Sequence, residues 1–293
     1  MTLQNKIKAY FDEAVVFDYD GQSNAHPIIT LNALKNIIGD DRQNVSQKLL
    51  DAMEKLTEKH PKRTDDKIIM DAVAKDGLGL TFFIAELEDA CQSGNPLEME
   101  QEAARLQWVS ENGLAGLNCL LEVALQDFDR LGLLVYHLQR ANAFNQDIKN
   151  TWSYTRCLLK EICKEPLSDP HDKADHGLSV MDKIPENNAQ SSKMAAAKRL
   201  WDGDYVRIQG YRREISHWFS NQEGENVPSY DKNIIDGLED YFYSGGNFFI
   251  ELAESLTDYP KKIVFLEALR YWTKNKQIAN LPFISNHISD LIT

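Results

Sequence analysis

The chain has 293 residues, of which 43% are hydrophobic and 26% are charged, and its formal net charge is −13. These proportions are ordinary for a folded globular protein and exclude a wholly disordered chain. The excess of acidic residues argues against nucleic-acid binding, because a phosphate backbone needs a clustered positive surface. The length permits either one large core or two smaller ones.

Apolar runs such as residues 131–138 and 263–269 stop well short of the roughly 20 residues that a bilayer span requires. The N-terminus lacks the apolar stretch and small-residue cleavage site of a secretory signal. We therefore expect a soluble, cytoplasmic protein without a membrane contact. The four cysteines form no Cys-x-x-Cys pair, which predicts buried free thiols rather than disulfides or a zinc site.

The N-terminal part of the chain shows helical apolar spacing with one exception. Residues 3–11, 27–38 and 42–59 each predict an amphipathic helix, the second one starting at a proline that suits a first helical turn. The exception is residues 14–21, where a β-branched and aromatic run before Asp-Gly is typical of a strand.

The middle of the chain predicts the centre of the fold. Residues 64–87 predict a long helix with a weak point at the glycines of 77–79. Residues 97–162 then carry apolar side chains at three- and four-residue steps, and 131–138 are apolar nearly all round. A helix that is apolar on all sides lies inside a core, so we place residues 131–138 at the centre of a helical bundle.

The composition changes after residue 163. Residues 164–192 are rich in Pro, Asp, Asn, Lys and Ser, which predicts a long polar loop or linker between lobes at 1–163 and 193–293. One continuous domain is the alternative. Helical spacing returns at residues 193–201, 205–219, 230–257, 260–272 and 282–292. The sequence as a whole predicts an all-α, multi-helix bundle of about ten to twelve helices.

Residues 15–21, Val-Val-Phe-Asp-Tyr-Asp-Gly, resemble the first motif of the haloacid-dehalogenase-like phosphatases. The resemblance implies a strand that presents Asp18 as a nucleophile and Asp20 as a general acid. Gln22 departs from the small or β-branched residue usual in that family, and the rest of the chain lacks the strand and helix alternation of its parallel sheet. A helix end followed by an Asp-Gly turn is the alternative interpretation.

Arg212 and His217 have the arginine-to-histidine spacing that resembles the HEPN-type helical ribonucleases, and so do Arg130 and His137. The resemblance implies a guanidinium that binds phosphate beside an imidazole that moves a proton. Glu214 lies three residues before His217, a step that puts two ligands on one helix face, as in di-iron bundles. Arg212, Glu214 and His217 are therefore the candidate catalytic residues, and an accidental match of this short spacing is the alternative.

The densest group of potential metal ligands lies in the polar loop. It consists of Asp169, His171, Asp175 and His176, whose carboxylates and imidazoles could hold zinc or a harder cation. A solvated acidic loop is the alternative interpretation.

Two acidic pairs, Asp40-Asp41 and Asp202-Gly-Asp204, resemble the aspartate-rich motifs of helical isoprenoid synthases, although neither continues into a third carboxylate. Such an enzyme would have a pocket lined by aromatic side chains. The candidate aromatic binding residues are Trp152, Trp218, Tyr241, Phe242, Tyr271 and Trp272.

Two classes of function remain open from the sequence. The first is a helical binding or assembly protein that contacts a protein partner or a small apolar ligand. The second is an all-α enzyme with an aromatic-lined pocket: HEPN-like, metal-dependent or isoprenoid-synthase-like, with a phosphatase as a remote alternative. The lack of a complete catalytic motif favours the first class. No motif specifies a cofactor or an oligomeric state.

Overall fold

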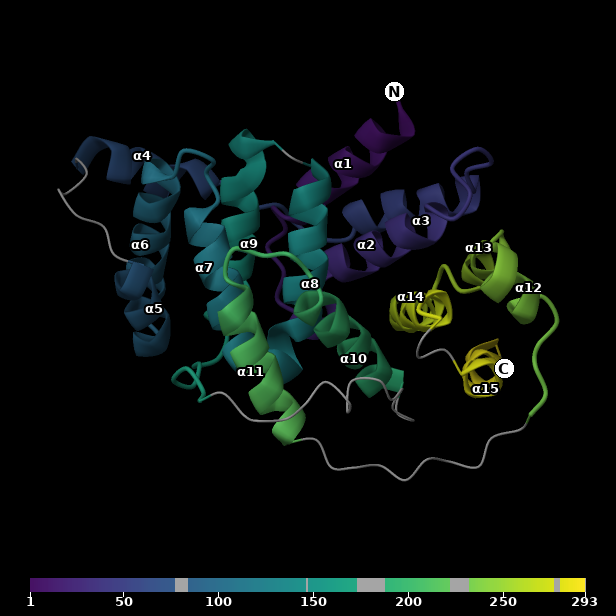
Figure 1. The fold of residues 1–293 in the computed structure, drawn as a ribbon. Helices are drawn as coiled ribbons and strands as arrows, with labels where there is room; N and C mark the ends of the chain where they lie inside the picture. Colours follow the sequence, from purple (N-terminus) through teal and green to yellow (C-terminus); the bar gives the residue numbers. More distant parts are fainter. Residues whose placement is uncertain (77–83, 146, 173–187, 222–231, 277–279, 293) are drawn as a thin grey trace.

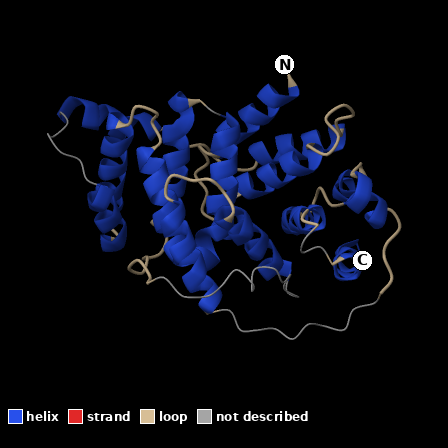
Figure 2. Cartoon of the chain, viewed as in Figure 1, coloured by secondary structure: helices blue, strands red, loops and turns tan. Residues whose placement is uncertain are grey.

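The structure, a computed structural model, describes residues 1–76, 84–145, 147–172, 188–221, 232–276 and 280–292. Over these residues the chain is helical apart from loops and one isolated β-bridge, with no strand (Figure 2). The α-helices are α1 (Leu3–Ala14), α2 (Pro27–Ile38), α3 (Gln47–Thr57), α4 (Asp66–Asp76), α5 (Ile84–Ser93), α6 (Pro96–Val109), α7 (Ala115–Ala124), α8 (Phe128–Asn145), α9 (Thr151–Ile162), α10 (Asn188–Trp201), α11 (Ile208–Ser220), α12 (Leu238–Ser244), α13 (Phe248–Ser255), α14 (Pro260–Lys274) and α15 (Leu281–Ile292). The predicted all-α, multi-helix bundle is confirmed. None of these helices is long and apolar enough to cross a bilayer.

Helix α8 is the centre of the fold, as its sequence predicts. Every residue from Leu131 to Leu138 is buried, so no side of this stretch faces solvent. Helices α1, α2, α7, α9, α10 and α11 all pack against α8 (Figure 1). Burial of one leucine side chain contributes about 1.5–3 kcal/mol, which explains why this apolar segment occupies the interior.

Four helices from distant parts of the sequence form a closed ring. Helix α2 packs on α8 and on α14, and α10 completes the ring by packing on the same two helices. Helices α12, α13 and α15 lie outside α14, next to one another in Figure 1. The apolar core runs without interruption from Ile7 to Leu291, so helices on both sides of residues 164–192 share one core.

The described residues contain more helices than the ten to twelve predicted, because predicted long helices are interrupted. The helix expected over 230–257 is broken between α12 and α13, where Gly245 and Gly246 have φ of 74° and 119°. These values suit glycine and would strain a residue with a side chain. The helix expected over 64–87 is represented by α4 and α5, and its weak point at 77–79 lies outside the described residues.

Residues 14–21 do not form the strand of a parallel sheet. Helix α1 extends to Ala14, and Phe17 then makes an isolated antiparallel bridge with Lys62. The Arg63 guanidinium holds this segment in place by donating to the carbonyl oxygens of Val15 and Phe17, at 2.8 Å each. The fold implied by the phosphatase resemblance is thus wrong for the described residues, and Asp18 is exposed, 3.8 Å from the Lys160 ammonium.

All four cysteines are free thiols, as the sequence predicts, and three of them are buried. Cys157 lies 3.6 Å from Nε2 of the buried His26, while Nδ1 of that imidazole accepts the backbone N–H of Ile28 at the start of α2. Burial raises the pKa of the Cys157 thiol to about 12. A neutral thiol in this position is a packing group rather than a nucleophile.

Candidate functional site

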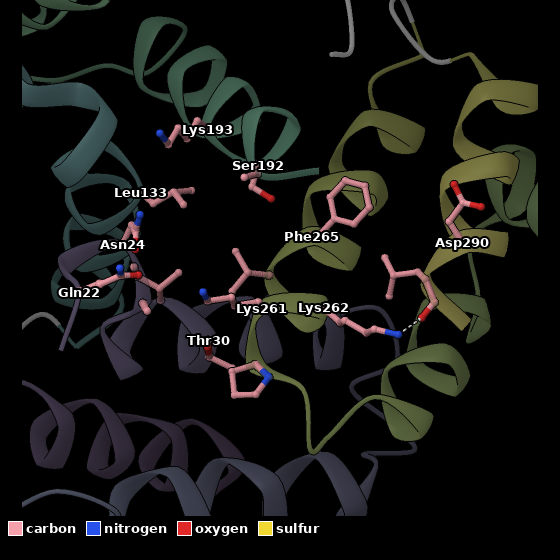
Figure 3. A pocket seen from close by; sticks show the side chains of 16 residues that line it. Gln22, Asn24, Thr30, Leu133, Ser192, Lys193, Lys261, Lys262, Phe265 and Asp290 are labelled. Carbon is pink, nitrogen blue, oxygen red and sulfur yellow. Dashed lines mark hydrogen bonds between the residues drawn. The ribbon is translucent and has the colours of Figure 1, made fainter. Parts of the chain in front are cut away.

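A cavity of about 340 Å³ opens at one end of the four-helix ring. Its walls come from α2, α8, α10, α14 and α15, together with the turn that precedes α2 (Figure 3). The apolar part of the wall includes Ile29, Leu133, Val264, Phe265 and Leu291. The volume lies within the range of small-molecule pockets, and a mostly apolar wall is typical of them.

The polar side chains of this cavity carry an excess of positive charge. Its wall includes three lysines, Lys193, Lys261 and Lys262, and one carboxylate, Asp290. The hydroxyls of Thr30 and Ser192 and the amides of Gln22 and Asn24 complete the polar part of the wall. The chain as a whole has a net charge of −13, so its composition would lead one to expect an excess of negative charge here instead.

Three of the four helices of the ring begin near this cavity. The cavity residues Thr30 of α2, Ser192 of α10 and Lys261 of α14 lie within the first turns of their helices. Helix N-termini carry partial positive charge and favour anions. The lysines in the first turn of α14 therefore add to the positive charge of the helix dipole. A carboxylate at this position would balance that charge and stabilise the helix.

The three lysines differ in how far their charge is already balanced. Lys193 donates to Asp129 Oδ1 at 2.7 Å, and Trp218 Nε1 donates to the same oxygen at 3.1 Å. Burial alone would raise the pKa of Asp129, but these two hydrogen bonds outweigh burial, so its pKa lies below the usual value. The Lys193 charge is thus largely compensated by this carboxylate.

Lys262 and Lys261 lie next to each other at the start of α14, and only Lys262 has an acceptor among the described residues. Lys262 donates to the backbone oxygen of Leu291 at 2.7 Å, which joins α14 to α15 in the cavity wall (Figure 3). The Lys261 ammonium donates to no residue in the described part of the chain, and its side chain is exposed. As far as the chain is described, Lys261 is therefore the cavity lysine whose ammonium can pair with a bound anion.

The candidate catalytic residues Arg212, Glu214 and His217 all lie on α11, but their side chains do not converge on one site. Arg212 donates to the backbone oxygen of Trp201 at 3.1 and 3.2 Å and lies over that indole ring. Glu214 is buried and His217 is half-buried. The guanidinium is therefore occupied at the end of α10, whereas the carboxylate and the imidazole face residues of the predicted polar loop.

His171, a candidate metal ligand, meets Glu214 and His217. Its Nδ1 lies 2.7 Å from Glu214 Oε2, and its ring stacks on that of His217 with 3.6 Å between centroids. Burial lowers the pKa of His217, and His171 lowers it further. Glu214, His217 and His171 thus belong to one cluster. On the sequence alone, the first two are candidate catalytic residues and the third is a candidate metal ligand.

The remaining candidate metal ligands do not complete a metal site in the described residues. Asp169 is exposed, and Asp175 and His176 lie outside the described residues. Within the described part of the chain no group of three or more His, Cys, Asp or Glu side chains is arranged to hold a metal ion.

Two other sequence motifs have structural partners. Arg130 donates to the backbone oxygen of Glu161, while His137 is buried and hydrogen-bonds Asn32, so this arginine and histidine serve different contacts. Asp40 is held by Arg270 and Tyr241. The ribonuclease and isoprenoid-synthase resemblances would require these side chains to bind a substrate. In the structure they bind other residues of the protein instead.

The six candidate aromatic residues are distributed over α9, α11, α12 and α14, and none of them lines the cavity. Trp152 Nε1 donates to the backbone of Asp66, and Tyr241 donates to Asp40. Trp272 is fully buried and Tyr271 packs under the Arg199 guanidinium. Trp218 contacts Phe128, and Phe242 lies under Lys276. Phe265 is the aromatic side chain of the cavity wall.

The cavity residues Thr30, Lys261 and Lys262 were not singled out from the sequence. One local signal exists, the Pro-Lys-Lys start of α14, where two cations stand at a position that favours acidic side chains. That signal indicates a positive helix end and says nothing of the cavity that it faces.

Comparisons of this chain with protein-family models, with curated proteins and with solved structures gave no match.

Proposed function

We propose that this protein binds a small amphipathic anion in the cavity of the four-helix ring. The ligand would have an apolar body the size of a medium-length acyl chain and one carboxylate or phosphate head. The proposal depends chiefly on one observation: three lysines and the first turns of three helices line a mostly apolar cavity. It belongs to the class of binding proteins with a small apolar ligand.

The two halves of the ligand would be recognised by different physical effects. Ile29, Leu133 and Phe265 supply apolar surface, and burying each methylene of a ligand contributes about 0.8 kcal/mol. The head would lie at the Lys261 side of the cavity, where a helix N-terminus and an ammonium with no acceptor among the described residues both favour negative charge.

Binding is preferred to catalysis because of the chemistry of the cavity wall. Its described residues include neither histidine nor cysteine, and its single carboxylate is Asp290. Enzymes most often transfer protons and attack substrates with such side chains, so the described wall is better suited to holding a molecule than to cleaving it.

Isothermal titration calorimetry with dodecanoate, dodecanol and dodecyltrimethylammonium tests the proposal, because the three ligands share an apolar chain and differ in charge. We expect dodecanoate to bind best and the cation worst. The exchange Lys261→Glu should weaken dodecanoate at least about tenfold, or about 1.4 kcal/mol. It should leave dodecanol almost unchanged.

Lys276→Glu is the matched control, because Lys276 is a lysine that lies over Phe242 outside the cavity. This exchange makes the same change in net charge and should not alter dodecanoate affinity. Equal affinity for the three ligands, or equal losses in the two variants, would contradict an anion site at this cavity. Failure of all three ligands to bind would instead favour a protein partner.

A further inference from the structure

The segment that follows α9 crosses α11 and places three polar side chains in series. Ser168 Oγ lies 3.3 Å from His171 Nε2, and His171 Nδ1 lies 2.7 Å from Glu214 Oε2. The backbone N–H of His171 also donates to Glu214 Oε1, at 3.3 Å. The serine and the histidine are three residues apart, whereas the glutamate comes from α11, 43 residues further along the chain.

The carboxylate fixes which nitrogen of His171 carries the proton. Glu214 is fully buried, and Arg213 Nε donates to its Oε1 at 2.8 Å, so the group acts as a charged acceptor. An accepting carboxylate requires a proton on His171 Nδ1, which leaves the Nε2 lone pair directed at the Ser168 hydroxyl. This is the connectivity of a serine nucleophile, a histidine base and a carboxylate that orients the base.

His171 makes more contacts than are needed to anchor its segment on α11. The backbone N–H and Nδ1 of His171 both bind Glu214, and these two bonds already hold the segment on α11. The contact between Nε2 and Ser168 is additional and lies at the surface, where Ser168 is exposed and the His171 side chain retains 21% of its accessibility. The hydroxyl is therefore open to a molecule from solution.

We propose that Ser168, His171 and Glu214 form an esterase-type triad that cleaves small activated esters at the protein surface. Ser168 Oγ attacks the ester carbonyl carbon, its proton passes to His171 Nε2, and the alcohol leaves with that proton. Water then attacks the acyl-serine, His171 takes the water's proton and returns it to Ser168 Oγ, and the acid is released. Glu214 is the positioning residue, and His217 supports the imidazole by stacking on it.

This site is independent of the cavity, so the two proposals can fail separately. Ser168→Ala should leave dodecanoate binding unchanged, and Lys261→Glu should leave reaction at Ser168 unchanged, because neither Ser168 nor His171 lines the cavity.

The test uses the full chain, a fluorophosphonate probe that phosphorylates activated serines, and mass spectrometry to locate the adduct. Hydrolysis of p-nitrophenyl acetate gives a second readout. We expect modification at Ser168, loss of this adduct in Ser168→Ala, and a rate about 100-fold lower in His171→Gln, the range that general-base catalysis contributes. Ser220 is the control, because its exposed hydroxyl donates to the His217 backbone oxygen instead of to an imidazole.

Variants of Glu214 and His217 separate chemistry from structure. Glu214→Gln should slow modification and Glu214→Asp should restore part of the rate, because only the second keeps a carboxylate. His217→Phe keeps a ring to stack on and should retain most of the rate. Modification of Ser168 no faster than that of Ser220 would overturn the proposal, and so would an unchanged rate in a folded His171→Gln protein with an unaltered melting temperature.

Discussion

Arg199 on α10 and Glu267 on α14 form a two-pronged ion pair inside the four-helix ring, with both N–O distances 2.8 Å. Asn36 of α2 donates to the same carboxylate at 3.0 Å, and the guanidinium lies 4.0 Å from the centroid of the Tyr271 ring. Burial alone would raise the pKa of Glu267, but Arg199 outweighs burial and holds this pKa at about 2. The pair stays charged because each member compensates the other's desolvation.

The first prediction concerns this pair. Arg199→Met or Glu267→Gln alone should lower the free energy of unfolding by about 3–5 kcal/mol, because each leaves a buried charge without its partner. The double variant Arg199→Met/Glu267→Met should recover much of that loss. Urea denaturation at pH 7 measures the three values.

Lys6→Met is the control for the ion pair, because Lys6 forms a more exposed pair with Glu54 at 3.7 Å. Exposed pairs contribute little to stability because water already solvates both charges, so this exchange should alter stability little. A single exchange at Arg199 or Glu267 that costs no more than the Lys6 control would contradict the burial of the charges.

The second prediction concerns acid stability. Burial lowers the pKa of both His26 and His137 from 6.5 to about 3. Between these values the unfolded chain binds protons that the folded protein excludes, so stability is complete above pH 6.5 and falls as the pH decreases toward 3. At pH 5 the loss should be about 2 kcal/mol for each histidine.

His137→Gln tests the contribution of one of these histidines. The amide can accept the hydrogen bond that Asn32 Nδ2 gives to His137 Nδ1, but it does not titrate. The slope of unfolding free energy against pH, measured by urea denaturation from pH 7.5 to 4.5, should decrease by about half. An unchanged slope would show that His137 does not drive the acid sensitivity.

The fold was predictable because its signals are local, whereas the cavity depends on distant contacts. The all-round apolar character of residues 131–138 predicts a central helix without knowledge of its neighbours, and α8 occupies that position. Thr30, Lys193 and Lys261 belong to helices whose spacing indicates only which side faces the core. Their convergence results from the packing of α2, α10 and α14, which local periodicity does not contain.

The cluster on α11 shows an intermediate case. Glu214, His217 and His171 could be singled out by residue type, since imidazoles and carboxylates are the side chains that move protons or bind metals. Their contact could not be predicted, because the segment that carries His171 is polar and has no periodicity that would place it on α11. Ser168 has no sequence signal and is identified by its distance from His171.

The third prediction concerns the close approach of α6 and α7. A Cβ atom at Gly116 would lie 2.9 Å from the backbone oxygen of Ala103, too close for two atoms that belong to rigid helices. Glycine to alanine inside a helix normally stabilises it by about 1 kcal/mol. Here Gly116→Ala should instead lower the unfolding free energy by about 1–3 kcal/mol, the cost of overpacking. A stabilised Gly116→Ala protein in urea denaturation would show that the helices can separate freely.

The last prediction uses the empty space of the cavity. Val264 lines it from α14, so Val264→Phe should direct a larger apolar side chain into this space. The larger ring would cover more of the apolar wall, and we expect about 1 kcal/mol of added stability together with loss of dodecanoate binding. Val206 is the control, because it is 89% exposed and Val206→Phe makes the same change in volume outside the cavity. If Val264→Phe still bound dodecanoate with unaltered affinity in calorimetry, the ligand would lie elsewhere on the protein.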